Sequence, residues 1–273
     1  MKRPLLLTFF AIATACCAFG QDIPTADQLI DKYLTAIGGK EAVAKIEDLT
    51  LSMSGESQRN GQPFLLEMEA KYKKPNKSMS VAYAFGQEVS RTTCNGEKVA
   101  SVRNMMGNQQ STVAEGNEAA MQILQGALFP EMLYEQYKIQ KIVVGKDTAA
   151  GKEAWKVEFA TTDGKKWFEF FDVVTGLKIR RIGSMEGRPG GQRGGGGAGA
   201  SAEGQRPAQG GQRGPGGGGM MGVTFGDYKE IKDGGGVKIP FTRQQGAGGF
   251  SMKITVSSAK ANKGIKESNF EIK

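Results

Sequence analysis

Apolar residues at the start of the mature chain recur with the spacing of an amphipathic helix. This pattern covers residues 26–37, and Thr25 with Gln28 forms a capping-box sequence at its beginning. The glycine pair at 38–39 predicts the end of the helix, because glycine is the usual residue just past a helix C-terminus. A second short helix is predicted over 40–46.

Helical spacing returns in the middle of the chain, over residues 117–128. Asn117 is the predicted N-cap, and Pro130 marks the stop, because the residue before a proline disfavours helical geometry. The apolar residues of this segment include Ala119, Ala120, Ile123, Leu124 and Leu128. We expect this third helix to pack on an open sheet face.

Elsewhere, apolar and polar residues alternate, which is the period of a strand with one buried face. The predicted strands include 49–53, 64–72, 79–85, 139–144, 155–159, 167–171, 177–185, 223–232, 237–245 and 250–260. The run 167–171 is almost wholly apolar, which is typical of a strand buried on both faces. Asn60-Gly61 and Asn95-Gly96 predict two-residue turns between antiparallel neighbours, and Pro240 fits an edge strand or a bulge.

These elements predict an α+β fold. About eleven antiparallel strands form a curved sheet, an incomplete β-barrel, and the N-terminal and mid-chain helices cover its open face. The glycine- and arginine-rich segment 187–222 has almost no apolar side chains, so it is predicted to be a disordered insertion between two strands. Residues 21–273 are otherwise predicted to form a single domain.

The first twenty residues have the anatomy of a signal peptide: a basic start, an apolar stretch over 5–15, and small residues before a cleavage point ahead of Gln21. We therefore expect an exported, periplasmic protein. The alternative is cleavage before Cys16, which would give an outer-membrane lipoprotein anchored at that residue.

Composition removes most catalytic chemistry. The chain has no histidine, which excludes His-based acid–base catalysis, Ser-His-Asp triads and most zinc sites. After cleavage before Gln21 only Cys94 remains, and without an activating histidine it is interpreted as a small apolar strand residue. No phosphate-binding loop occurs. We predict no enzyme activity, no cofactor and no metal site.

The net charge of +8 includes several arginines of the 187–222 segment. In an exported protein, this basic segment predicts contact with an anionic membrane surface or an envelope partner, not with nucleic acid. A solvated spacer without a partner is the other interpretation of the segment.

The apolar face of the predicted strands is the candidate ligand-binding surface, because one-sided apolar strands closed by helices make either a packed core or a pocket. Methionine is frequent along it and adapts to varied apolar ligands. The cavity candidates are Leu51, Met53, Leu66, Met68, Met79, Val81, Tyr83, Trp155, Phe168, Phe170 and Ile179. The mid-chain helix, through its five apolar residues named above, is the expected lid.

Several stretches resemble the LolA/LolB-like family of outer membrane lipoprotein-sorting proteins. They are residues 28–53, 127–130, 226–230, 236–241 and 269–271. The resemblance implies an incomplete antiparallel barrel whose helices cover an apolar cavity, which accepts lipoprotein acyl chains in carriers of this class. The insertion 187–222 departs from the family pattern.

The sequence therefore predicts a periplasmic, non-catalytic binding or carrier protein for a lipid, a lipoprotein acyl chain or another hydrophobic ligand. The alternative is an envelope protein-interaction module with a solid barrel, which would use the basic loop or a sheet edge.

Overall fold

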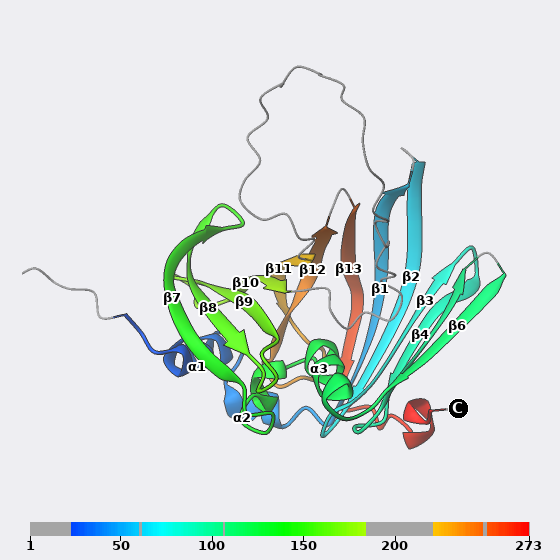
Figure 1. The fold of residues 1–273 in the computed structure, drawn as a ribbon, viewed down its shortest axis with the longest axis horizontal. Helices are drawn as coiled ribbons and strands as arrows, with labels where there is room; N and C mark the ends of the chain where they lie inside the picture. The colour runs from blue at the N-terminus through cyan, green and yellow to red at the C-terminus, as the bar shows by residue number, and fades with distance from the viewer. Residues whose placement is uncertain (1–22, 60–61, 106, 184–220, 248–249, 273) are drawn as a thin grey trace, which may run out of the picture.

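The structure is a computed structural model that describes residues 23–59, 62–105, 107–183, 221–247 and 250–272. The predicted signal peptide, Cys16, the Asn60-Gly61 turn and nearly all of the 187–222 insertion lie outside these residues. Within them, the α+β prediction is confirmed: the strands form one curved antiparallel sheet that stays open, with helices against it (Figure 1). The sheet has thirteen strands in the described residues, compared with about eleven predicted.

The helical elements are α1 (Ala26–Ala36), α2 (Lys40–Ala44), α3 (Gly116–Gly126) and the 3-10 turns η1 (Pro130–Leu133) and η2 (Glu267–Phe270). The strands are β1 (Asp48–Arg59), β2 (Gln62–Lys73), β3 (Lys77–Ala84), β4 (Gln87–Cys94), β5 (Val99–Met105), β6 (Asn108–Ala114), β7 (Gln140–Ala149), β8 (Lys152–Ala160), β9 (Lys166–Asp172), β10 (Lys178–Gly183), β11 (Met221–Glu230), β12 (Lys238–Ala247) and β13 (Phe250–Ala261).

The strand order explains the shape of the sheet. It is β6-β5-β4-β3-β2-β1-β13-β12-β11-β10-β9-β8-β7, so the two edges, β6 and β7, are consecutive in the chain. The connection between them contains α3 and η1. As Figure 1 shows, α3 therefore lies in the hollow of the curved sheet, between its two arms. Register shifts between β1 and β13, β3 and β4, β7 and β8, and β9 and β10 add local twist to the sheet.

The helix boundaries follow from local sequence. The capping box of α1 is confirmed. The Thr25 side-chain hydroxyl accepts a hydrogen bond from the Gln28 backbone N–H at 3.2 Å, and the Gln28 side-chain carbonyl accepts one from the Thr25 backbone N–H at 2.8 Å. The prediction for α3 is wrong at its start, because its N-cap is Glu115 and not Asn117. The Asn95-Gly96 hairpin is present but has a four-residue loop, in which the Asn95 side chain accepts from the N–H groups of Glu97 and Lys98.

The main hydrophobic core lies on the inner face of the sheet, between the strands and the helices α1, α2, α3 and η1. It contains Leu34 of α1, Leu51 of β1, Leu124 of α3, Phe159 of β8 and Phe171 of β9, each almost fully buried. The predicted burial of β9 on both faces is also observed, since Trp167, Phe170 and Phe171 are all buried.

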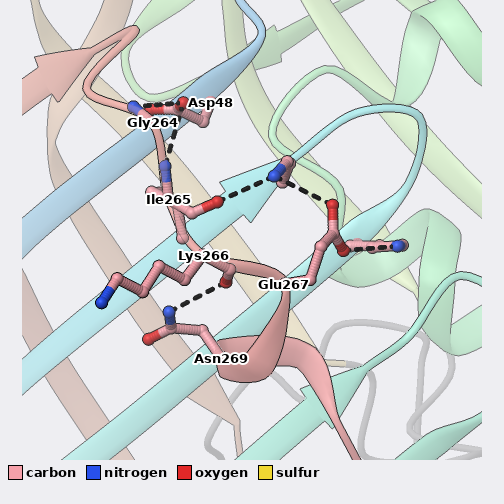
Figure 2. Close-up of polar contacts among 8 residues, drawn as sticks. Asp48, Gly264, Ile265, Lys266, Glu267 and Asn269 are labelled. Carbon is pink, nitrogen blue, oxygen red and sulfur yellow. Dashed lines mark hydrogen bonds and ion pairs between the residues drawn. The ribbon is translucent and has the colours of Figure 1, made fainter.

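The C-terminal segment crosses the outer face of the sheet and is held by Asp48 (Figure 2). The Asp48 carboxylate accepts hydrogen bonds from the backbone N–H groups of Lys263, Gly264 and Ile265, at 2.8, 2.8 and 3.2 Å. Further along, Glu267 forms ion pairs with Lys73 and Lys77 at 2.9 and 2.6 Å. These contacts seat Phe270 against Met79 and Val81 of β3.

Replacing Asp48 with alanine is expected to lower the free energy of unfolding by about 2 kcal/mol, because three backbone donors lose a charged acceptor. Urea denaturation measures the loss. The matched control is Glu47→Ala, because Glu47 makes an exposed ion pair with Lys74 at 3.0 Å and such pairs contribute less than about 1 kcal/mol. Equal losses for the two variants would contradict the assigned role of Asp48.

Candidate functional site

Strand register determines which side chains face the hollow of the sheet. Directly paired residues of antiparallel strands point to the same face, and Leu51 fixes the inner face because it lies in the main core. Three rows cross the inner face at the centre of the sheet. Two of these rows run across β12, β13, β1 and β2 in that order: Gln245, Met252, Ser57 and Phe64, and Arg243, Ile254, Gly55 and Leu66. The third row runs across β13, β1 and β2: Val256, Met53 and Met68.

The central rows form an apolar patch that we call the methionine face, made of Met53, Leu66, Met68 and Met252 around Gly55. A side chain at position 55 would meet Met68 Cε at 3.2 Å, Met252 Sδ at 3.3 Å and Leu66 Cβ at 3.5 Å. The four side chains are only partly buried. Of the four, only Met53 packs against the main core in the described part of the chain. Flexible, partly exposed thioether side chains on a concave face suit an apolar ligand of variable shape.

A second apolar feature lies where α2 and the connection from α3 to η1 meet the ends of β1, β2 and β3. It is a pocket of about 120 Å³ with a mostly apolar lining. The lining includes Val43, Leu49, Tyr72, Leu128 and Met132. A pocket of this size can hold only a few non-hydrogen atoms of a ligand.

Five of the cavity candidates lie on the inner face. Leu51 is buried in the core, Met53 and Trp155 pack against it, and Leu66 and Met68 belong to the methionine face. The lid candidates also lie inside: Ala119, Ile123 and Leu124 are buried, whereas Ala120 and Leu128 are partly buried. The structure thus brings these candidates to one side of the sheet. Their role in ligand binding stays a prediction.

Three candidates on β3 point the other way. Met79, Val81 and Tyr83 pair with Lys71, Glu69 and Glu67 of β2, which belong to the outer face. Met79 and Val81 are buried there against Phe270 of the C-terminal segment, and Tyr83 packs beside them. The prediction that these three residues line the same cavity wall as Leu51 and Met68 is therefore wrong. The inner positions of β3 are instead Ser78, Ser80, Ala82 and Ala84.

Phe168, Phe170 and Ile179 also lie on the outer face. Phe168 and Phe170 pair with Glu158 and Lys156 of β8, and Phe170 packs with Ile179 in a separate small cluster. The Lys156 ammonium lies 4.9 Å from the centre of the Phe168 ring. The assignment of these three residues to the cavity is wrong. Because β9 is apolar on both faces, alternation alone could not tell which of its side chains face inward.

A buried charged cluster lies at the base of the inner face, and the sequence analysis missed it. Lys178 of β10 forms ion pairs with Glu131 of η1 and, at 3.6 Å, with Glu169 of β9. Arg181 approaches Glu169 at 3.8 Å. Glu169 also accepts hydrogen bonds from the Tyr134 hydroxyl at 3.0 Å and from the Trp167 indole N–H at 3.3 Å. Both glutamates are fully buried.

Burial shifts the pKa values of ionisable groups in this cluster. Burial raises the pKa of the Glu131 carboxyl, and the charge of Glu169 raises it further, although Lys178 opposes the shift. Burial also raises the pKa of Tyr134, with Glu169 adding to the effect. One carboxylate oxygen on each glutamate, Oε2, has no hydrogen-bond partner among the residues that the structure describes. The cluster therefore connects η1 to the sheet through buried ion pairs while leaving some of its acceptors without hydrogen bonds.

Cys94 lies on the inner face of β4, buried in the main core. Burial raises the pKa of its thiol, which favours the protonated form over the thiolate. Within the described ranges, no group of acidic or cysteine side chains has the arrangement of a metal site. None of the described helices has the length and apolar character needed to cross a membrane.

Three solved structures are similar to this chain over most of its length. A DUF1329 family protein from Desulfovibrio piger has a TM-score of 0.55 at 10% identity, and the match covers 91% of this chain and 98% of that one. A LolA superfamily protein from Nitrosomonas europaea has a TM-score of 0.53 at 8% identity over 92% and 99% of the two chains. A protein described as an outer membrane lipoprotein-sorting protein domain, from Vibrio parahaemolyticus, has a TM-score of 0.51 at 12% identity over 88% and 97%.

These matches define the class of fold: the chain has a LolA-like fold, as the sequence resemblance implied. No protein-family model and no curated protein matches the chain. Since the identities are 8%, 10% and 12%, the likeness concerns the fold alone.

Proposed function

We propose that the protein is a non-catalytic binding or carrier protein of the bacterial cell envelope, with a hydrophobic ligand such as a lipid or a lipoprotein acyl chain. The observation that carries this proposal is the methionine face. Met68, Leu66 and Met252 are apolar, partly exposed and placed on the concave side of the sheet. Apolar side chains on the hollow side of a curved sheet favour an apolar occupant.

Two further observations support the same role. The predicted signal peptide favours export, and one of the solved structures with this fold is described as a lipoprotein-sorting domain. The charged cluster of Glu131, Glu169 and Lys178 is closed off from solvent, so it fits a role in holding η1 in place better than a role in turning over a substrate.

A pair of adjacent residues tests the proposal. Leu66 belongs to the inner methionine face, whereas Leu65 is 64% exposed and lies on the outer face. Leu66→Asp is expected to weaken binding of the neutral fluorescent probe N-phenyl-1-naphthylamine at least tenfold, because the carboxylate would be desolvated by the ligand. Leu65→Asp is expected to leave the affinity unchanged. Fluorescence titration of the detergent-free protein measures both.

Native mass spectrometry provides an independent measurement. Protein purified without detergent is expected to carry a lipid-sized mass that is reduced in Leu66→Asp. If the native protein carries no ligand and both variants bind the probe like the wild type, the proposal fails. The alternative role as an interaction module with a solid interior would then be favoured.

A further inference from the structure

The charges on the inner side of η1, β9, β10 and β12 do not balance among the described side chains. They are two carboxylates, Glu131 and Glu169, and three cations, Lys178 and Arg181 of the buried cluster and Arg243 of β12. The difference of 3 − 2 leaves one surplus positive charge. Because a partly buried charge without a counter-ion is unfavourable, this surplus predicts an anionic partner that comes from outside the chain.

Arg243 has no carboxylate partner among the described residues, although its charge acts on the Tyr228 hydroxyl. It faces inward from β12, where it pairs with Phe225 of β11 and Ile254 of β13. Its Nε atom is buried and has no hydrogen-bond partner in the part of the chain that the structure describes. No ion pair between described residues involves its guanidinium. Both of its cross-strand neighbours are apolar, so neither can satisfy that donor.

Arg181 is only loosely neutralised. Its guanidinium stacks over the Trp167 ring at 5.2 Å, and its Nε lies 3.8 Å from Glu169, beyond the length of a hydrogen bond. Glu169 already accepts from Tyr134 and Trp167 and faces Lys178. The Arg181 side chain remains 17% exposed, so part of it is accessible from the hollow of the sheet.

The two arginines lie next to the methionine face. Arg243 shares an inner row with Ile254, Gly55 and Leu66, and Arg181 shares the next row with Gln245 and Met252 through Val223. Since neighbouring strands are about 4.8 Å apart, Arg243 lies about 10 Å from Gly55 along its row. An anionic group at Arg243 would therefore allow an attached apolar chain to extend over the methionine face.

We propose that Arg243, assisted by Arg181, binds the carboxylate or phosphate group of an amphiphilic ligand whose apolar chain lies on the methionine face. This inference rests on the proposed function and narrows it from a hydrophobic ligand to an anionic amphiphile. Arginine suits the task because its planar guanidinium stays charged and presents paired donors that match carboxylate and phosphate oxygens.

The test compares ligands that share a twelve-carbon chain and differ in the head group. Dodecanoate, dodecyl phosphate and dodecanol are each titrated against bound N-phenyl-1-naphthylamine at pH 7.5, below the micelle concentrations of the two anions and the solubility limit of dodecanol. Wild-type protein is expected to bind the two anions at least tenfold more tightly than dodecanol. Arg243→Gln is expected to reduce this preference to less than threefold, while the affinity for dodecanol stays the same.

Two variants control the experiment. Lys253→Gln removes a cation from the outer face of β13, next to Ile254, and is expected to keep the preference for anions. Arg243→Lys keeps the charge but loses the planar donor pair, so it is expected to retain part of the preference. If Arg243→Gln does not fold, as judged by circular dichroism, Arg181→Gln and Arg243→Lys still test the site through their reduced preferences.

The outcomes separate this inference from the function on which it rests. Equal wild-type affinities for the anions and dodecanol would overturn the inference and leave the hydrophobic-ligand proposal standing. A preference that survives in both Arg243→Gln and Arg181→Gln would also overturn it. Tight binding of inorganic phosphate alone would indicate a free-anion site and contradict the amphiphile. If none of the three twelve-carbon ligands displaces N-phenyl-1-naphthylamine, the result counts against both this inference and the proposed hydrophobic-ligand function.

Discussion

Replacing Lys178 with methionine is expected to lower the free energy of unfolding by about 3–5 kcal/mol, because the change leaves two buried carboxylates without their shared cation. Lys178 is almost fully buried and pairs with both Glu131 and Glu169. Its ammonium also lies 5.3 Å from the centre of the Tyr33 ring, which methionine can still contact but cannot stabilise by charge. Urea denaturation monitored by tryptophan fluorescence measures the loss.

The control for Lys178→Met is Lys229→Met. Lys229 pairs with Asp227 at 2.8 Å, but both side chains are largely exposed, so its loss is expected to change stability by less than about 1 kcal/mol. The double variant Glu131→Leu with Lys178→Met removes one charge of each sign, and it is expected to be more stable than Lys178→Met alone. A double variant that is less stable than Lys178→Met would contradict the assigned pairing.

Replacing Phe159 with alanine is expected to lower the free energy of unfolding by about 3–5 kcal/mol. Phe159 is fully buried, stacks on Trp167 with ring centres 5.4 Å apart, and packs against Tyr134 at 5.1 Å. The substitution opens a cavity between β8, β9 and the segment after η1. Because Tyr134 and Trp167 both donate to Glu169, the cavity would also loosen the charged cluster.

Phe168→Ala is the matched control for Phe159→Ala. Phe168 lies on the outer face of β9, is only partly buried and contacts Lys156, so its truncation leaves no closed cavity. Its loss is expected to be less than half that of Phe159→Ala in the same urea denaturation experiment. Equal losses would show that the interior near Phe159 relaxes after truncation and is not tightly packed there.

The elements of the fold could be predicted where local chemistry determines them. Thr25 and Gln28 specify the start of α1, and the alternation around Leu51 and Met68 identifies β1 and β2. The three strands between residues 87 and 114 gave weaker signals, because their inner positions include Ser90, Thr92 and Ser101 in place of large apolar residues. A polar inner face in one arm of the sheet hides the strand pattern.

The candidate site was predicted only in part, for a physical reason. Alternation gives the period of each strand but not which phase faces inward, since that depends on register with its neighbours. The C-terminal segment buries Met79 and Val81 on the outer face, so their apolar character fits either side. Glu169 was missed because a single charge in the run 167–171 does not reveal that Lys178, Tyr134 and Trp167 surround it.

Pro240 illustrates the same limit. It lies in β12, an interior strand, although proline favours edges. The ladder between β12 and β13 begins only at Thr242, so the missing N–H of Pro240 falls outside the paired part of that ladder. A strand can therefore be interior by its order in the sheet and still have residues at one end that are not paired on one side.

An open sheet of this kind leaves two rows of backbone donors and acceptors that could template the addition of another molecule. The β7 margin is bent by the register shift between Val143 and Gly145 and carries Lys141 and Lys146, which make flat stacking unfavourable. The β6 margin is mostly polar from Asn108 to Thr112 and well hydrated. The bend and the lysines of β7 and the polar residues of β6 therefore disfavour the addition of further strands at these two edges.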